Sequence, residues 1–207
     1  MLSAASIVAM HDRQTQVWHL EPETGSEARQ HANQDPAGDW LRAVSRQHRA
    51  NFDLWHIEDE ARAPAVTDAQ LAAVKRRIDT TNQLRNDLAE QLDLFLLAWL
   101  QPQGLPYPTA PLHSESPGLI IDRLSIQALK MYHTREEADR ADAPAGHAAR
   151  NNDRLAILEQ QRADLAVCLD ALWRETLAGT RQFKLYRQLK MYNDPSLNPA
   201  IYLNRPA

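Results

Sequence analysis

Apolar residues recur at the three- and four-residue spacing of an amphipathic α-helix along most of this chain, and no other feature restricts its fold as much. The two-residue alternation of a β-strand is hard to find anywhere. Residues 101–117 contain five prolines, so they fit neither a helix nor a central strand. We therefore predict an all-α fold, an antiparallel bundle of four long helices with a short N-terminal helix and a packed, partly irregular C-terminal tail.

Cap and turn residues divide the 207 residues into parts of a single predicted domain. Pro64 ends one helix, Thr67-x-x-Gln70 is a capping box, and Ser116-Pro117 places a hydroxyl cap and a first-turn proline before another helix. The expected helices cover residues 3–19, 39–63, 67–100, 117–139 and 152–178. The predicted parts are an N-terminal helix and loop at 1–38, a first helical pair at 39–100, a proline-rich crossover at 101–117, a second helical pair at 118–178 and a tail at 179–207.

Composition excludes several classes of function. The net charge is −4 at pH 7, so the chain lacks the basic surface of a nucleic-acid-binding protein. One cysteine can form neither an internal disulfide nor a multi-cysteine zinc site, and no Walker, dinucleotide, HExxH or GxSxG motif is present. Met1–Met10 lacks the basic start of a signal peptide and Leu92–Leu100 is too short for a membrane span, so we expect a cytoplasmic protein.

Polar side chains continue the apolar stripe of the predicted helix at residues 39–63. When residues are placed at 100° intervals, this stripe begins apolar and becomes polar without changing direction. Its members in chain order are Leu41, Val44, His48, Phe52, Trp55, Asp59 and Arg62, with Asn51 at its edge. Leu41 and Val44 should face the core, so we expect the polar members to point inward or into a groove between helices.

The predicted helix at residues 67–100 carries a polar arc opposite its apolar face. This arc includes Asp79, Asn82, Gln83 and Asn86. A solvated surface is the ordinary explanation, but asparagine is a poor helix former and is better suited to directional hydrogen bonds in a groove. Folding the helical pair about residue 65 places Asn51 near Asp79. We therefore expect His48, Asn51 and Asp79 to share a cluster, either a structural network or one wall of a ligand site.

Two later segments add candidate ligand-binding residues. They are Asp122, Arg123 and Ser125 in the predicted helix at 117–139, and Lys190, Tyr192, Asn193 and Asp194 in the tail. The ordinary alternatives are a structural hydroxyl for Ser125 and a simple turn before Pro195. The tail also carries the apolar residues Ile201, Tyr202 and Leu203. This apolar content predicts that the tail packs against the body of the protein.

The sequence offers no recognisable catalytic constellation. A di-metal carboxylate bundle requires Glu-x-x-His, which the chain lacks. Glu90-x-x-Asp93 supplies half of the paired acidic motif of an all-helical, magnesium-dependent nucleotide pyrophosphohydrolase, to which Asp79 could add a ligand. The sequence therefore identifies no catalytic residue and no cofactor, and we expect no metal site.

Five blocks of the sequence carry a family resemblance. The blocks are His48–Arg62, Lys75–Asp79, Asn82–Asp87, Pro117–Ile126 and Lys190–Pro195. Together they resemble, in this order, the bacterial domain-of-unknown-function family 4254, from about residue 40 to the tail. The resemblance implies no reaction. It does imply an association, because members of the family are often encoded beside glycosyltransferases of surface-sugar assembly.

These observations predict a polar groove between helices that binds a sugar phosphate or a nucleotide-sugar. Trp55 would stack on the sugar or the base, and Arg62 or Arg123 would bind phosphate. One alternative is a non-catalytic partner of a glycosyltransferase, in which the polar residues only set the helix register. The magnesium-dependent pyrophosphohydrolase is a second alternative. A symmetric homodimer through Leu92–Leu100 is a further hypothesis.

Overall fold

The computed structural model describes residues 2–20, 36–187, 189, 196–199 and 203. Its helices are α1 (Ala4–Leu20), α2 (Pro36–Glu60), α3 (Asp68–Leu100), the 3-10 turn η1 (Gln101–Gln103), α4 (Pro117–Asp139) and α5 (His147–Leu177). The described residues form no β-strand, only an isolated bridge between Leu112 and Gln182. The all-α prediction is confirmed. The largest difference from the expected helix ends is at α5, which begins at His147 rather than at residue 152.

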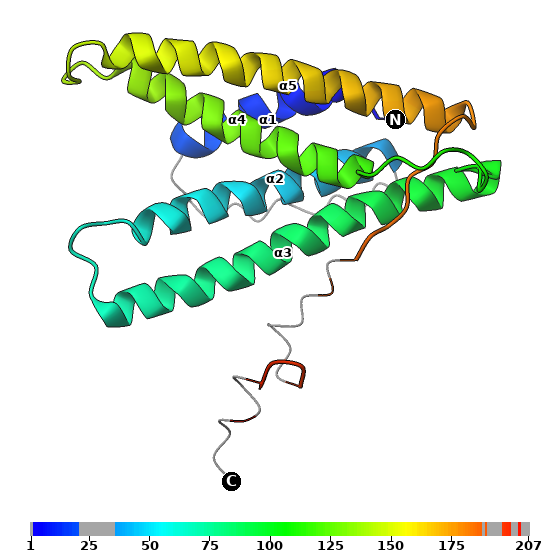
Figure 1. Ribbon diagram of the computed structural model, residues 1–207, viewed down its shortest axis with the longest axis horizontal. Coiled ribbons are helices and arrows are strands. Elements are labelled where there is room, and N and C mark those ends of the chain that lie inside the picture. Colours follow the sequence, from blue (N-terminus) through cyan, green and yellow to red (C-terminus); the bar gives the residue numbers. More distant parts are fainter. Residues whose placement is uncertain (1, 21–35, 188, 190–195, 200–202, 204–207) are drawn as a thin grey trace.

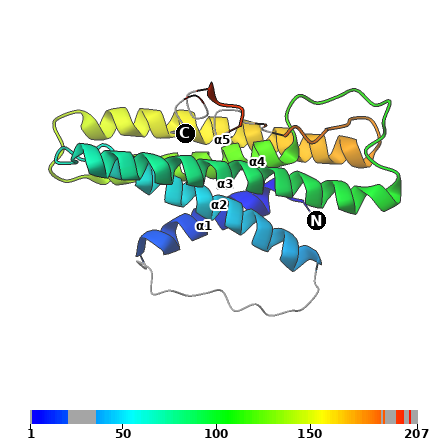
Figure 2. The same ribbon diagram turned by 90° about the horizontal axis from the view of Figure 1, so that it is seen from below.

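The long helices form two pairs, α2 with α3 and α4 with α5 (Figure 1). Helix α4 also packs against α2 and α3, and these contacts join the two pairs. Helix α1 lies against α2, α4 and α5. In Figure 2, α3, α4 and α5 run lengthwise together while α1 and α2 lie on one side of them. None of the helices in the described part of the chain offers an apolar stretch that would cross a bilayer.

Helix α3 begins with the predicted capping box. The side-chain oxygen of Thr67 accepts the N–H of Gln70, and the Gln70 side chain accepts the backbone N–H of Thr67 at 3.0 Å. Both groups satisfy backbone donors that the first helical turn leaves free. Before α5, Gly146 adopts φ = 77°, a left-handed conformation that glycine reaches without steric cost. This turn allows α5 to begin directly at His147.

The start of α4 is capped from a second helix. Ser116 accepts the N–H of Leu119 and donates its hydroxyl to Asp93 of α3, whose Oδ1 accepts the N–H of Gly118 at 2.7 Å. Asp93 is 3% exposed, and burial raises its pKa to about 6. Its carboxylate is thus a helix cap and not a free ligand for a cation. This removes the acidic pair Glu90-x-x-Asp93 on which the pyrophosphohydrolase alternative depended.

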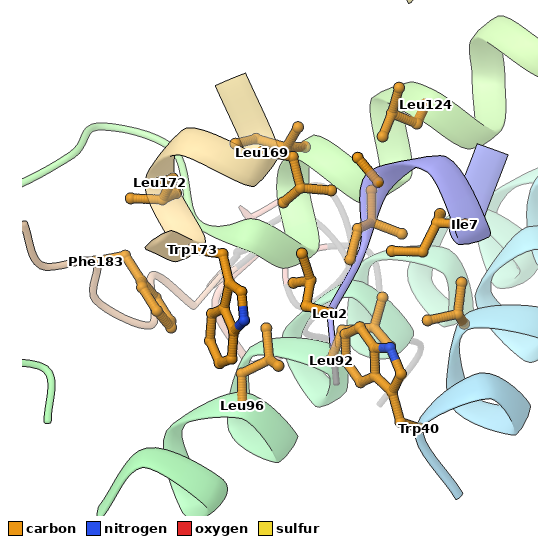
Figure 3. Packing of buried hydrophobic residues seen from close by; sticks show 14 of the residues in the cluster. Leu2, Ile7, Trp40, Leu92, Leu96, Leu124, Leu169, Leu172, Trp173 and Phe183 are labelled. Atoms are coloured by element: carbon orange, nitrogen blue, oxygen red, sulfur yellow. The ribbon is translucent and has the colours of Figure 1, made fainter. Parts of the chain in front are cut away.

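The main apolar cluster lies in the half of the molecule where α3 and α5 end. Figure 3 shows its packing from close by. All five α-helices contribute to it, through the first residues of α1, α2 and α4 and the last turns of α3 and α5. Leu92, Leu96 and Leu100 of α3 are completely buried, as are Leu124 and Leu169. Each such side chain contributes about 1.5–3 kcal/mol through burial. Because this half supplies most of the apolar packing, the other ends of α1, α2 and α4 are available for polar groups.

The buried face of α2 is rotated relative to our prediction. Leu41, expected in the core, is 42% exposed, whereas its neighbour Trp40 is 1% exposed and Val44 is completely buried. Gln47 is also completely buried. The angular pattern located the stripe correctly near Val44 and His48. It could not determine that the large ring of Trp40, one residue from Leu41, would be the side chain buried in the core, beside Phe95 of α3.

The tail meets the body through its first residues. Phe183 is 2% exposed and belongs to the core, and the backbone oxygen of Gln182 accepts the N–H of His113 at 2.7 Å. Beyond it, Leu189 and Leu203 are 82% and 73% exposed. The prediction of a packed tail is therefore right for Phe183 and wrong for these two leucines. Tyr192, Ile201 and Tyr202 lie outside the described residues, as do residues 21–35 of the loop predicted at 21–38. The last three residues of that loop belong to α2 instead.

Candidate functional site

A fully buried histidine joins three helices at the middle of the molecule. The Nδ1 atom of His48 lies 2.7 Å from the hydroxyl of Ser125 on α4, and its Nε2 atom lies 2.9 Å from the hydroxyl of Thr15 and 3.1 Å from the carbonyl oxygen of His11, both on α1. A carbonyl only accepts, so Nε2 carries the proton and Nδ1 accepts from Ser125. Burial lowers the pKa of His48 to about 4, so the ring is neutral.

Asp122 of α4 is the second centre of this buried network. Its Oδ1 atom accepts hydrogen bonds from Nε2 of Gln47 at 2.6 Å and from Nδ2 of Asn51 at 2.9 Å. Arg85 donates to both carboxylate oxygens, from Nε to Oδ1 at 2.8 Å and from Nη2 to Oδ2 at 2.5 Å. Asn51 also donates to Ser125 at 2.9 Å, which links the two centres. The paired guanidinium and carboxylate form the bidentate geometry that gives strong, directional ion pairs. One carboxylate therefore connects α2, α3 and α4.

A pocket of about 370 Å³ opens next to this network, between α2, α3 and α4. Its walls are Asn51, Leu54, Trp55, Glu58, Asp59, Arg62, Arg85, Ile126 and Leu129. The volume lies at the small end of the range for small-molecule sites. Arg85 and Asn51 belong to both the network and the pocket, so the buried hydrogen bonds also position two residues of the wall.

The outer part of the pocket is charged and accessible. Arg62 donates to the backbone oxygen of Glu58 at 2.7 Å and to its carboxylate at 3.0 Å, and lies 3.8 Å from Asp59. The Arg62 side chain is 66% exposed, so these ion pairs contribute little to stability and exchange readily. Trp55 stacks on His133 with ring centres 4.8 Å apart and an interplanar angle of 8°. An aromatic face, two carboxylates and a guanidinium thus surround an apolar floor.

The structure separates the predicted site residues into groups. His48, Asn51, Asp122 and Ser125 form the buried network, and Asn51, Trp55, Asp59 and Arg62 line the pocket. Asp79 belongs to neither group. It pairs with Lys75 one turn away and lies at a shallow surface hollow together with Gln83. The predicted cluster of His48, Asn51 and Asp79 is therefore wrong.

The error comes from the register of the α2–α3 pair. Folding about residue 65 placed Glu60 opposite Gln70, but Glu60 forms an ion pair with Arg77 at 2.5 Å, seven residues further along α3 (77 − 70). The same displacement moves Asn51 from Asp79 to the region of Arg85. The seven-residue connection at 61–67 allows this offset, because a chain of that length does not hold two helices in the register of a tight turn.

The remaining predicted residues lie away from the pocket. Asn82 and Asn86 are half-buried on α3 but are not part of its walls, and Gln83 donates to Asp87 at 2.7 Å. Arg123 is paired with Glu115 through two contacts of 2.8 Å and points away from Asp122. The four tail residues lie outside the described part of the chain, namely Lys190, Tyr192, Asn193 and Asp194.

Sequence reasoning missed Arg85, the ion-pair partner of Asp122. Only its place inside the family block Asn82–Asp87 indicated a role for Arg85, and the polar arc predicted from that block consisted of Asn82, Gln83 and Asn86. A second omission is a group of three histidines, His19, His56 and His133, each of which has one ring nitrogen within 4.8 Å of those of the other two. It is the only group in the described residues whose nitrogen, sulfur and carboxylate atoms are arranged so that they could hold a metal ion. No local spacing could reveal it, because each ring comes from a different helix.

Comparison with known proteins gives one result. The sequence profile of a family described as "protein of unknown function (DUF4254)" matches residues 41–185. This range begins in the second turn of α2, ends beyond α5 and includes the whole pocket, but not α1. No curated protein and no solved structure matches the chain.

Proposed function

The chain belongs to the DUF4254 family, and from the pocket itself we propose that it binds a sugar phosphate or a nucleotide-sugar between α2, α3 and α4. The observation that carries this proposal is the wall composition, in which Trp55, two carboxylates and Arg62 stand over Leu54, Ile126 and Leu129. Small-molecule sites commonly combine such an apolar base with a few polar groups that fix the ligand's orientation.

Each wall residue has a role suited to such a ligand. The Trp55 ring is held by His133 and offers a rigid surface on which a sugar or a base can stack. Glu58 and Asp59 accept hydrogen bonds from hydroxyl groups. Arg62 binds phosphate by exchanging its exposed carboxylate partners for the ligand. Arg85 is held by Asp122, so its role is to position the inner wall.

The charge of the pocket limits which ligands fit. Glu58 and Asp59 repel an unpaired phosphate, so either ligand should bind better when a metal ion neutralises its phosphate charge. The sugar part of the proposal is supported by the resemblance to a family often encoded beside glycosyltransferases. No serine, threonine or cysteine is among the described residues that line the pocket. We propose binding and assign no reaction to the pocket.

A thermal-shift screen of the purified chain tests the proposal. The panel holds nucleotides, nucleotide-sugars and sugar phosphates, each with and without Mg²⁺ or Mn²⁺. A ligand at 100 times its Kd stabilises the fold by about 2.7 kcal/mol, which raises Tm by roughly 5–10 °C for a chain of this size. An absence of any shift would contradict the proposal and favour the alternative of a non-catalytic glycosyltransferase partner.

Two matched arginine variants locate the binding site. Arg62→Gln should abolish the ligand-induced shift and leave the Tm of the free protein within about 2 °C, because its ion pairs are exposed. Arg42→Gln is the control, since Arg42 is another exposed arginine paired with a carboxylate, that of Asp39, but lies outside the pocket. A ligand response that both variants retain equally would place binding elsewhere.

A further inference from the structure

Three histidines meet where the far ends of α1, α2 and α4 come together, next to the pocket. We propose that His19, His56 and His133 bind one divalent transition-metal ion, with Zn²⁺ the best suited. One ring nitrogen from each histidine lies within 4.8 Å of those from the other two. Ring-centre separations are 5.0 Å from His19 to each of the other two and 5.8 Å between His56 and His133. This inference does not depend on the ligand proposed above.

The hydrogen bonds of the rings determine which nitrogens are free. Nδ1 of His19 lies 2.6 Å from the carbonyl oxygen of Thr15, and Nδ1 of His56 lies 2.8 Å from that of Phe52. Nδ1 of His133 lies 2.7 Å from the carboxylate of Glu136. Carbonyl and carboxylate oxygens accept, so each Nδ1 carries its ring's proton. Each Nε2 therefore keeps the lone pair that binds a metal.

Two of these three Nε2 atoms have no hydrogen-bond partner among the described residues. Nε2 of His19 and Nε2 of His133 are both buried without a hydrogen bond. A buried hydrogen-bond acceptor without a partner costs about 1–3 kcal/mol of stability. Two such acceptors side by side would therefore destabilise a cluster that had only a structural role. A metal ion would satisfy both. The pairing of each Nδ1 with an oxygen is also the arrangement that orients histidine ligands in metalloproteins, and Glu136–His133 is a carboxylate–histidine pair of that type.

The ligand set indicates the class of metal. Three imidazoles suit Zn²⁺, Co²⁺, Ni²⁺ or Cu²⁺, whereas Mg²⁺ and Ca²⁺ prefer oxygen ligands. Bonds of 2.0–2.1 Å at tetrahedral angles require nitrogens about 3.4 Å apart, so binding draws the rings closer than in the empty cluster. Three protein ligands leave a fourth position open for water or another molecule.

Aromatic neighbours hold the rings in place. Tyr132 stacks on His19 with centres 4.1 Å apart and an interplanar angle of 18°, and Phe52 contacts both His19 and His56. Trp55 stacks on His133 and also lines the pocket. The metal would therefore lie beside the pocket, with the indole ring of Trp55 between them.

Cobalt binding to the full-length, tag-free and chelator-treated protein tests the site. We expect one Co²⁺ per chain, with the visible absorption of four-coordinate Co²⁺. Zn²⁺ should displace it, in keeping with the order of divalent-metal affinities, and excess Mg²⁺ should not. Glu136→Gln should weaken binding about 10–100-fold, as expected for loss of a partner of a metal-binding histidine.

A matched pair of histidine variants makes the test specific. His133→Gln should weaken Co²⁺ binding by more than about 100-fold, beyond the loss expected for an outer partner. His147→Gln should leave it unchanged, although His147 has nearly the same side-chain exposure (22% against 23%) and is likewise bonded to a glutamate. If His133→Gln fails to fold, as judged by loss of its helical circular dichroism, His56→Gln replaces it in the comparison. No stoichiometric Co²⁺ binding, or equal loss in His147→Gln, would overturn the proposal.

Discussion

His48 shows how much a single side chain depends on its surroundings. The same residue on a helix surface would be an exposed base, but here it is completely buried between Thr15 and Ser125. The network requires its neutral form, because the protonated ring would place a second proton against Ser125 and a charge in an apolar interior. His11, stacked on it with ring centres 4.3 Å apart, is also buried, and its pKa is likewise lowered by burial.

This burial predicts a pH dependence of stability. The pKa of His48 falls from 6.5 in the unfolded chain to about 4 in the fold, so between these values the unfolded state binds the extra proton. The stabilisation is fully present above pH 6.5 and is lost as the pH falls toward 4, by about 3 kcal/mol. Urea unfolding of the wild type and of His48→Gln from pH 4 to 7 gives the free energy of unfolding of each as a function of pH. The difference between these two curves measures the contribution of His48.

The wild-type curve must be compared with that of His48→Gln because Asp93 changes the stability with pH in the opposite direction. Its pKa is raised from 3.8 to about 6, so the folded state binds the extra proton and stability decreases as the pH rises across this interval. The total curve of the wild type therefore combines opposed contributions, because His11 and His19 act in the same direction as His48 and Asp93 acts against them. Parallel curves for wild type and His48→Gln would contradict our account of His48.

At the scale of helices, the contact between α3 and α4 depends on a missing side chain. A Cβ atom on Gly118 would lie 2.3 Å from the backbone oxygen of Ala89 and 2.9 Å from Oδ1 of Asp93. The close approach lets Asp93 reach the first turn of α4 and cap it. Glycine at this position therefore serves packing between helices, although it is an unfavourable residue for the helix itself.

Gly118→Ala should accordingly destabilise the protein. Intrinsic helix propensity alone would make this change stabilising by about 1 kcal/mol. The clash is with backbone, which cannot rotate away, so we expect a loss of about 1–3 kcal/mol, as for other overpacked sites. Equilibrium urea unfolding measures the sign. A gain in stability would show that α3 and α4 are not held as closely as described.

The whole molecule is divided along its length. One half contains the apolar core, the middle contains the network around Asp122 and His48, and the other end contains the pocket and the three histidines. This division assigns stability mainly to the first half and the centre. It allows the far end to carry exposed polar groups such as Arg62 at little cost to the fold.

The central ion pair should be important for the stability of the whole fold. Asp122→Ala would leave Arg85 with its guanidinium largely buried and without its partner, so we expect a loss of about 3–5 kcal/mol. Glu115→Ala removes the carboxylate of the exposed Arg123 pair and should cost no more than about 1 kcal/mol. Comparable losses in the two variants, measured by thermal and urea unfolding, would contradict the special role of Asp122.

Much of this protein was determined by its sequence alone. Helical periodicity, prolines and caps predicted the all-α fold, the capping box at Thr67 and the start of α4 at Pro117, because these are local properties of the backbone. The angular stripe also predicted that His48 and Asn51 would face inward, and that Trp55 and Arg62 would share a groove. Each of these conclusions concerns one helix or its immediate end.

Tertiary structure decided which faces meet. The offset between α2 and α3 replaced Asp79 by Arg85 as the partner of the central network, and the packing of Trp40 rotated the buried face of α2. The three histidines are brought together from positions 19, 56 and 133 only when α1, α2 and α4 converge. Helix register and rotation depend on side-chain packing between elements distant in sequence, and no local pattern contains that information.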